Sequence, residues 1–269
     1  MAGSFSSSTG LRGLGVLILV LALAAGAWFA FDDGFRSQRS ALINGGPDAF
    51  GQQVRAYLLE NPDVIIEALQ GLEERRRTAE LNEVQTVIQS RAEELLNDPA
   101  SPVGGNPAGD VTLVEFFDYN CPYCRRVGPV MIDAEEDDPE LRIVYKEFPI
   151  LGPNSIAAAK AALATHRQGR YAEFHKALMQ AKGAADEASA LKLAEELGLD
   201  MERLKKDMEA PEIQAAIDRN LALAQALRIT GTPSFIIGDQ LMPGATDLET
   251  LQALIGRART GQSQEDGSG

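Results

Sequence analysis

The chain has 269 residues and a mass of 28.9 kDa, and its 25 Lys plus Arg against 39 Asp plus Glu give a formal net charge of −14. An acidic surface repels the phosphates of DNA and RNA, which excludes nucleic acid as a partner. With 45% hydrophobic and 24% charged residues, most of the chain has a globular composition. Its two cysteines are too few for a disulfide-stapled mini-domain or a four-cysteine zinc site.

The N-terminal segment indicates the compartment. Gly13–Phe31 is a run of 19 uncharged residues, preceded by Arg12 and followed by two aspartates. Its length favours an uncleaved membrane anchor, whereas Ala25-Gly26-Ala27 also suits signal-peptide cleavage, so both alternatives stay open. The charge order places everything after Phe31 outside the cytoplasm. We expect a protein of the periplasm or cell envelope, anchored in the inner membrane by residues 13–31 or released into the periplasm as a soluble protein.

A connector and a helical extension are predicted over residues 32–96. Apolar residues recur every three or four positions from Asp48 to Leu96, which is typical of helix. Asn61-Pro62-Asp63 is a helix-start signal, so we expect a short helix and then a long one. The charged run at residues 73–77 interrupts the apolar seam and argues against a long coiled coil. Residues 97–109 are rich in Pro and Gly and are predicted to be a linker.

An α/β domain is predicted over residues 110–258, followed by a disordered tail over residues 259–269. Val111–Phe117 is a nearly continuous apolar run, typical of a strand buried on both faces of a sheet. Later segments indicate a second strand, a helical block, a hairpin around Gly238-Asp239 and a closing helix. These segments are Leu141–Phe148, Asn154–Leu227, Ser234–Ile237 with Gln240–Met242, and Asp247–Arg257.

The two cysteines form a CxxC motif, Cys121-Pro122-Tyr123-Cys124, between a buried strand and a helix. A CxxC alone suits a zinc half-site, a copper pair, a structural disulfide or a redox dithiol. At a helix start, the backbone N–H groups favour an ionised, exposed and attacking sulfur on Cys121. Cys124, one turn further, would be less exposed and would resolve a mixed disulfide. Pro122 and Tyr123 would tune the redox balance through turn geometry and solvent access.

Glu115 lies six residues before Cys121, inside the apolar strand. Burial of a carboxyl is costly and raises its pKa, so Glu115 is a candidate to exchange a proton with Cys124 through a trapped water. The alternative is a strand-end glutamate that reaches solvent. Lys146 in the next strand is a candidate partner. His166 and His175 lie in the helical block without a second ligand at metal spacing, so we interpret them as ordinary helix histidines.

Several motifs together resemble the DsbA-like branch of the thioredoxin superfamily. They are FFDYNCPYC, the acidic residue six positions before the first Cys, the helical block and GTPSFIIGD, over about Asp110–Arg257. The resemblance implies a thioredoxin-like fold with a helical insertion at about 154–227. It also implies a cis Pro233 that faces Cys121, and a Thr232 backbone that pairs with an extended substrate strand. The segment VRAYLLENPDVIIEALQ resembles the N-terminal extension of envelope members, some of which oligomerise through it.

These features predict a thiol-disulfide oxidoreductase that oxidises or rearranges the cysteines of exported polypeptides. We expect a redox partner in the membrane or periplasm, self-association through the N-terminal helices, and neither a cofactor nor a resident metal. An isomerase or reductase that acts as an oligomer stays open, because the motif has Pro-Tyr where the best-known oxidase has Pro-His. A copper carrier and a binding module with an inert disulfide are the alternatives from other classes.

Overall fold

A computed structural model describes residues 47–261, so the expectations for residues 13–31 and for most of the tail lie outside the described residues. Within residues 47–261, no helix has the length and apolar character that a membrane crossing requires. The chain divides into two compact units between Arg75 and Arg76. Each unit is described by itself below.

The described part of the first unit, residues 47–75, is helical. α2 (Pro47–Glu60) is followed by the start of α3 (Asp63–Ser90), with the predicted break at residues 61–62. The side-chain amide of Asn61 donates a hydrogen bond to the carbonyl oxygen of Tyr57 at 2.9 Å, and Asp63 occupies the first turn of α3. Many large apolar side chains of this unit are exposed, namely Phe50, Val54, Tyr57, Leu59, Ile65, Ile66, Leu69 and Leu72.

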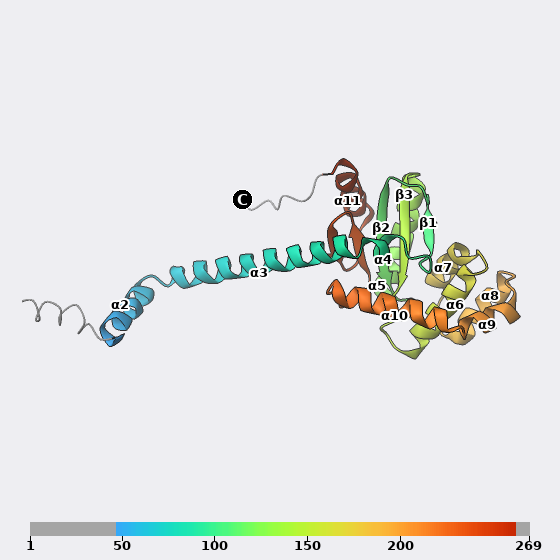
Figure 1. The fold of residues 1–269 in the computed structure, drawn as a ribbon, viewed down its shortest axis with the longest axis horizontal. Helices are drawn as coiled ribbons and strands as arrows, with labels where there is room; N and C mark the ends of the chain where they lie inside the picture. Colours follow the sequence, from blue (N-terminus) through green and yellow to red (C-terminus); the bar gives the residue numbers. More distant parts are fainter. Residues whose placement is uncertain (1–46, 262–269) are drawn as a thin grey trace, which may run out of the picture. The chain divides into compact units, whose positions relative to one another are not determined.

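The second unit is built on a five-stranded mixed sheet with the order β1-β3-β2-β4-β5 (Figure 1). The central strands β2 (Val111–Phe117) and β3 (Leu141–Glu147) are parallel, and the other neighbouring pairs are antiparallel. The remaining strands are β1 (Val103–Gly105), β4 (Ser234–Ile237) and β5 (Gln240–Pro243). The predicted strands and hairpin are therefore confirmed.

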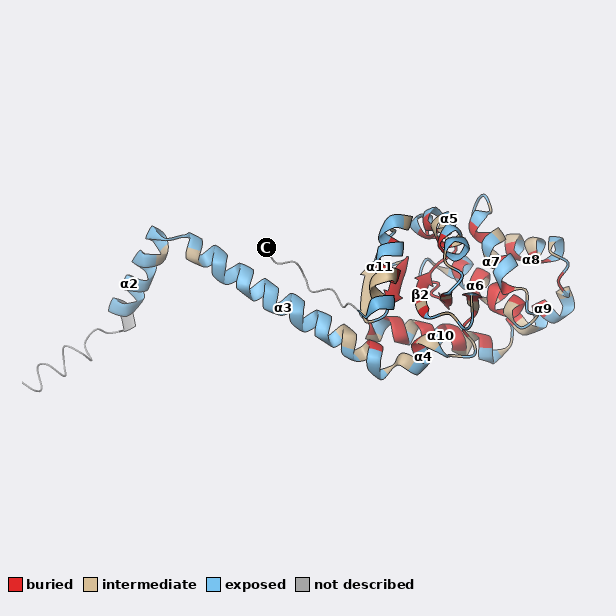
Figure 2. Cartoon of the chain, turned by 90° about the horizontal axis from the view of Figure 1, so that it is seen from above, coloured by how far each residue is buried: buried red, intermediate tan, exposed pale blue. Residues whose placement is uncertain are grey.

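Helices cover both faces of the sheet, which explains why its central strands are nearly continuous apolar runs. Leu113 and Phe117 lie in a core cluster with residues of α5 (Pro122–Asp137) and α11 (Leu248–Thr260). Val114 and Phe116, one residue out of phase, lie in a second cluster with residues of α10 (Pro211–Ala226), α4 (Ala92–Leu96) and the end of α3. In Figure 2 β2 and the inner side of α10 are coloured as buried, whereas the edge strand β5 is mostly intermediate.

The predicted helical block forms between β3 and β4. Besides α10 it contains α6 (Pro153–His166), α7 (Tyr171–Gln180), α8 (Glu187–Glu196) and α9 (Met201–Met208). Helix α6 is rich in buried alanines, which allow α8 and α9 to pack closely against it. Helix α7 also contacts α5, the helix that begins after Cys121, and so brings the insertion beside the CxxC motif.

Three structural expectations need correction. The segment 97–109 is not devoid of regular structure, because Val103–Gly105 forms β1 and pairs with β3. The C-terminal part of the predicted helical extension is not separate from the α/β domain. Its residues Ile88 and Leu95 are buried in the same core cluster as Val114 of β2. Residues 259 and 260 belong to α11 rather than to a disordered tail.

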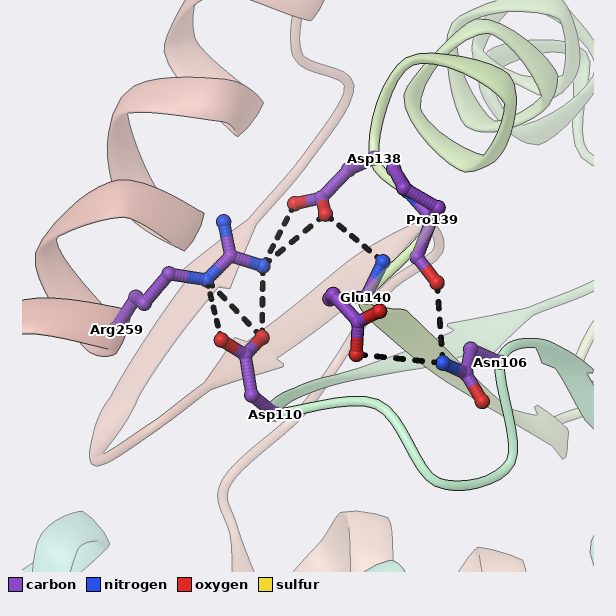
Figure 3. Close-up of polar contacts among 6 residues, drawn as sticks. All are labelled: Asn106, Asp110, Asp138, Pro139, Glu140 and Arg259. Atoms are coloured by element: carbon purple, nitrogen blue, oxygen red, sulfur yellow. Dashed lines mark hydrogen bonds and ion pairs between the residues drawn. The ribbon is translucent and has the colours of Figure 1, made fainter.

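An ion cluster fastens the end of α11 to the sheet (Figure 3). The guanidinium of Arg259 donates to both carboxylate oxygens of Asp110, just before β2, and to both of Asp138, just after α5. Asp138 in turn accepts a hydrogen bond from the backbone N–H of Glu140 at 3.1 Å. The closing helix is thereby linked to the two segments that flank its packing partners β2 and α5.

Candidate active site

The CxxC motif occupies the predicted strand-to-helix junction. Cys121 has an extended backbone and caps α5, and Pro122 is the first residue of that helix. Both cysteines carry free thiols and both are buried: Cys121 is 4% exposed and Cys124 is fully buried. The expectation of an exposed Cys121 is therefore wrong, because the loop that contains Thr232 lies against its sulfur.

Thr232 and Pro233 contact the CxxC motif across 111 residues of sequence. The Cys121 thiol donates a hydrogen bond to the carbonyl oxygen of Thr232, with Sγ and O separated by 3.2 Å. The Thr232–Pro233 peptide bond is cis, as the resemblance implied. Pro233 directly precedes β4, where the lack of an N–H costs no sheet hydrogen bond. The fold therefore brings Thr232 to the sulfur that the sequence predicts to be the attacking one.

Glu115 is 2% exposed, so the alternative of a glutamate that reaches solvent is wrong. Burial raises its pKa to about 8. Burial also raises the pKa of Cys124, and the charge of Glu115 raises it further. The two groups therefore influence each other through their charges. Proton exchange between Glu115 and Cys124 stays a prediction.

Lys146 does not pair with Glu115. The parallel register places Glu115 opposite Tyr145 and Lys146 opposite Phe116, so the two charged side chains lie on opposite faces of the sheet. The Lys146 ammonium instead donates to the carbonyl oxygen of Glu94 at 2.6 Å and to the hydroxyl of Ser101 at 2.7 Å. Burial lowers its pKa to about 8.

A cavity of about 700 Å³ lies between α5 and α7 and extends to Glu115. Met131 and Ile132 of α5 line one side, and His175 and Met179 of α7 line another. The cavity gives Glu115, which the sheet otherwise encloses, a neighbouring space large enough for water.

A polar cluster beside the CxxC loop was missed by the sequence interpretation. Tyr119 is 1% exposed, and its hydroxyl lies 3.1 Å from Oε1 of Glu147 and 3.0 Å from Nδ1 of His175. The hydroxyl of Tyr171 donates to the same Glu147 oxygen at 2.8 Å. Burial lowers the pKa of His175 to about 3 and raises that of Glu147. The i,i+4 spacing of Tyr171 and His175 was the available signal, whereas Glu147 belonged to an apparently ordinary strand end.

Arg125 is half-buried beside the CxxC loop. Its Nε donates to the carbonyl oxygen of Tyr119 at 2.6 Å, and its Nη1 donates to that of Ala181 at 2.7 Å. Arg125 therefore links the loop before Cys121 to the end of α7. Arg126 is exposed, and its guanidinium lies 5.2 Å from the ring centre of Tyr123.

The described residues contain no group of three or more His, Cys, Asp or Glu side chains that is arranged to hold a metal ion. The interpretation of His166 and His175 as ordinary helix histidines stays a prediction, and His175 has specific buried partners in Tyr119 and Tyr171.

Comparisons with known proteins agree with the site geometry. Residues 112–256 match the DSBA-like thioredoxin domain, and residues 48–79 match the Copper resistance protein ScsC N-terminal domain. The crystal structure of a thioredoxin-like oxidoreductase from Silicibacter pomeroyi DSS-3 is 53% identical, with a TM-score of 0.61 over 62% of this chain and 97% of that chain. BcfH of Salmonella enterica Typhimurium is 29% identical, with a TM-score of 0.68 over 82% of this chain and 99% of that chain.

Among curated proteins, the Na(+)/H(+) antiporter NhaA 1 of Salinispora arenicola is 30% identical over 161 residues, which are 59% of this chain and 25% of the antiporter. The chain thus matches about a quarter of the length of that relative. The DSBA-like match covers more than half of the chain and includes both cysteines and Pro233. The chain belongs to the DsbA-like thioredoxin family of thiol-disulfide oxidoreductases.

Proposed function

We propose that the protein exchanges disulfides with exported polypeptides through Cys121, with Cys124 as the second sulfur and Glu115 as the proton donor and acceptor. The observation that carries the proposal is the 3.2 Å contact between the Cys121 sulfur, at the start of α5, and the carbonyl oxygen of Thr232. One buried sulfur thereby lies beside backbone that is partly exposed and able to pair with a substrate strand.

In the oxidising direction, a substrate thiolate attacks Sγ of Cys121 in the Cys121–Cys124 disulfide. The S–S bond breaks, and Cys124 leaves with the electron pair. A buried Cys124 thiolate is a poor leaving group, because burial raises the pKa of its thiol. Glu115 holds a proton at neutral pH, since its pKa is about 8, and it supplies that proton to Cys124. A second substrate thiolate then attacks the substrate sulfur, which releases oxidised substrate and reduced Cys121.

Substrate recognition relies on exposed apolar side chains near the motif. Tyr123 is 54% exposed, and Leu151, in the loop after β3, is 51% exposed. The Leu151 backbone N–H donates to Asp118 Oδ2 at 3.0 Å, which holds this loop beside the segment before Cys121. Pro122 and Tyr123 also separate the two sulfurs and limit solvent access. Extended, unfolded segments with apolar residues beside a cysteine fit this surface.

The direction of electron flow distinguishes an oxidase from an isomerase or reductase. Self-association favours an isomerase, and the exposed apolar residues of α2 and the start of α3 offer a surface for a second copy of this chain. Trapping thiols in intact cells discriminates the two functions. A mostly oxidised Cys121–Cys124 pair supports an oxidase, and a mostly reduced pair supports an isomerase or reductase.

We place the protein in the periplasm or cell envelope, with residues 13–31 as its inner-membrane anchor. The support is the charge order around that apolar segment and the envelope redox chemistry of the family. Fractionation tests the anchor: the full chain should stay with membranes, whereas recovery in the soluble periplasmic fraction with a shortened N-terminus indicates cleavage.

A copper-related role is the second candidate, because residues 48–79 match a domain named for copper resistance and because two soft sulfur ligands lie three positions apart. Titration of the reduced protein with Cu(I) tests it, with Cys121→Ser as the control. Tight Cu(I) binding that is lost in Cys121→Ser supports a copper carrier. Weak Cu(I) binding that is equal in the two proteins excludes a copper carrier.

The decisive experiment for the leading proposal follows oxidation of a reduced, unfolded protein that contains two cysteines. Cys121→Ser should lose turnover, because the sulfur that forms the mixed disulfide is gone. Full turnover by that variant would contradict the proposal.

A further inference from the structure

The side chains of Tyr119, Tyr171, His175 and Glu147 form hydrogen bonds with one another. Their contacts allow only a few ways of placing the protons. Nδ1 of His175 contacts the Tyr119 hydroxyl at 3.0 Å and the Tyr171 hydroxyl at 3.5 Å. Both hydroxyls contact Oε1 of Glu147, at 3.1 Å from Tyr119 and 2.8 Å from Tyr171. Oε2 of Glu147 is buried and has no hydrogen-bond partner among the described residues.

With Glu147 protonated on Oε1, one direction satisfies every short contact. Tyr171 donates to Glu147, the Glu147 carboxyl donates to the Tyr119 oxygen, and Tyr119 donates to an unprotonated Nδ1 of His175. The proton of the neutral His175 ring is then on Nε2. His175 lines the cavity between α5 and α7, so its ring connects the buried carboxyl to the space beside Glu115.

With Glu147 ionised, the same atoms satisfy the reverse direction. His175 then carries its proton on Nδ1 and donates to the Tyr119 oxygen, while Tyr119 and Tyr171 both donate to the carboxylate. Three protons move in this change. The Glu147 proton passes to the Tyr119 oxygen, the Tyr119 proton passes to Nδ1 of His175, and the proton on Nε2 of His175 leaves to the cavity. Atoms and charge balance, and no buried contact is lost in either state.

We propose that Glu147, Tyr119 and His175 form a proton relay between a buried carboxyl beside the CxxC loop and the cavity that reaches Glu115. Glu147 acts on the site through Tyr119, so it is a positioning residue. Its carboxyl holds the Tyr119 hydroxyl, and Tyr119 lies two positions before Cys121. The inference deepens the proposed function, since the relay state biases the proton on Glu115. It rests on that function only for this last step.

The surroundings of Glu147 are consistent with both states. From β2 and the segment after it, the charges of Glu115 and Asp118 raise its pKa, whereas the hydroxyls of Tyr119 and Tyr171 lower it, and burial outweighs the other effects. From α10, the Asn220 amide donates to the Glu147 backbone oxygen at 3.1 Å and not to its carboxyl. Two further titratable side chains face the cluster. The ring centre of Tyr145 of β3 is 4.5 Å from that of His175 and 5.6 Å from that of Tyr171, and the ring centre of His166 of α6 is 6.1 Å from that of Tyr171. Burial raises the pKa of Tyr145 further above its usual range, so its hydroxyl keeps its proton in both states.

The tautomer of His175 reports the state of the relay. The chain has two histidines, so nitrogen-15 spectra of histidine-labelled full-length protein are simple, and His166→Gln assigns them. We expect His175 to stay neutral throughout and to change from the Nε2–H to the Nδ1–H tautomer as the pH rises. Glu147→Gln should abolish this change, because a glutamine cannot lose the proton. Tyr119→Phe should uncouple His175 from Glu147, and Tyr57→Phe, an exposed tyrosine of α2, should behave as the native chain.

A second measurement follows the redox pair. The pH dependence of the Cys121–Cys124 reduction potential should lose one inflection in Glu147→Gln and in Tyr119→Phe and keep it in Tyr57→Phe. A His175 tautomer that is constant with pH in the native chain, or that still changes in folded Glu147→Gln, would overturn the relay. Absence of any redox couple in the native chain would instead contradict the proposed function, and the tautomer result would stand independently.

Discussion

The thiol of Cys121 donates a hydrogen bond to the carbonyl oxygen of Thr232, with 3.2 Å between sulfur and oxygen. The contact covers the sulfur and places it next to a backbone group that, in the proposed function, a substrate strand would approach. A bound substrate must therefore displace this contact or share it before the sulfur reacts.

Replacement of Cys124 should trap the intermediate. In Cys124→Ser the second sulfur is absent, so a mixed disulfide between Cys121 and a substrate cannot be resolved from within the protein. We expect covalent complexes with cysteine-containing exported polypeptides on non-reducing gels. Cys121→Ser is the matched control and should give none, and equal amounts of complex from both variants would contradict the assigned order of attack.

Glu115→Gln should change the pH dependence of stability. The carboxyl is protonated in the native state up to its raised pKa of about 8, whereas in the unfolded chain it ionises near 4.5. The native state therefore binds more protons between these values, and native stability falls as the pH rises from about 4.5 to about 8. Removal of the carboxyl should flatten this fall, by up to about 5 kcal/mol.

Urea unfolding at the two ends of that pH interval measures the Glu115 effect. Glu135→Gln is a suitable control, since its carboxyl also lines the cavity but lies on α5. A pH dependence that is the same in Glu115→Gln and in the native protein would refute the assignment of a protonated Glu115.

Gly105→Ala should destabilise the second unit by about 2 kcal/mol or more. Gly105 has a φ of 62°, and an added Cβ would lie 2.3 Å from the carbonyl oxygen of Leu141. Gly256→Ala is the matched control, because Gly256 lies inside α11 with open space around its Cβ position, and it should stabilise by about 0.5 to 1 kcal/mol. Thermal unfolding of both variants tests the pair, and a neutral Gly105→Ala would show that β1 adapts.

Arg259→Gln should lower the melting temperature, because Asp110 and Asp138 lose the cation that links them (Figure 3). These groups are near the surface, so the difference from the native protein should shrink as salt is added. Arg75→Gln, an exposed arginine of α3, should show neither effect. A salt-independent loss in Arg259→Gln would indicate that packing of the arginine side chain matters more than its charge.

Charge on the apolar surface of the N-terminal helices should weaken self-association. Ile66 and Leu69 are 53% and 56% exposed, so Ile66→Glu and Leu69→Glu should fold but reduce the mass measured by light scattering. Glu67→Gln changes charge on the same helix without adding a carboxylate and serves as the control. A native chain that is monomeric at all concentrations would exclude this use of the surface.

Local sequence patterns were sufficient to predict most of the helices and strands. Val111–Phe117 could be predicted because a strand covered on both faces must be apolar along its whole length, and the start of α3 could be predicted from Asn61-Pro62-Asp63. Strand β1 could not, because its three residues lie among prolines and glycines and are held by pairing with β3.

The site divides in the same way. Cys121, Cys124 and Glu115 lie within ten positions of one another, so their placement around one strand-to-helix junction follows from local geometry. The expected ion pair between Lys146 and Glu115 failed, because the register between β2 and β3 places the two side chains on opposite faces. Register is a property of two strands together, and one strand alone does not specify it.

The sequence by itself determined a pair of cysteines at a helix start and a carboxyl in an apolar strand, since both follow from residues close along the chain. The tertiary structure alone decided that Thr232 covers Cys121, and that Tyr119, His175 and Glu147 share one set of hydrogen bonds. These contacts join residues that are 28 to 111 positions apart, and they exist because sheet pairing and packing of the helical insertion bring distant segments together.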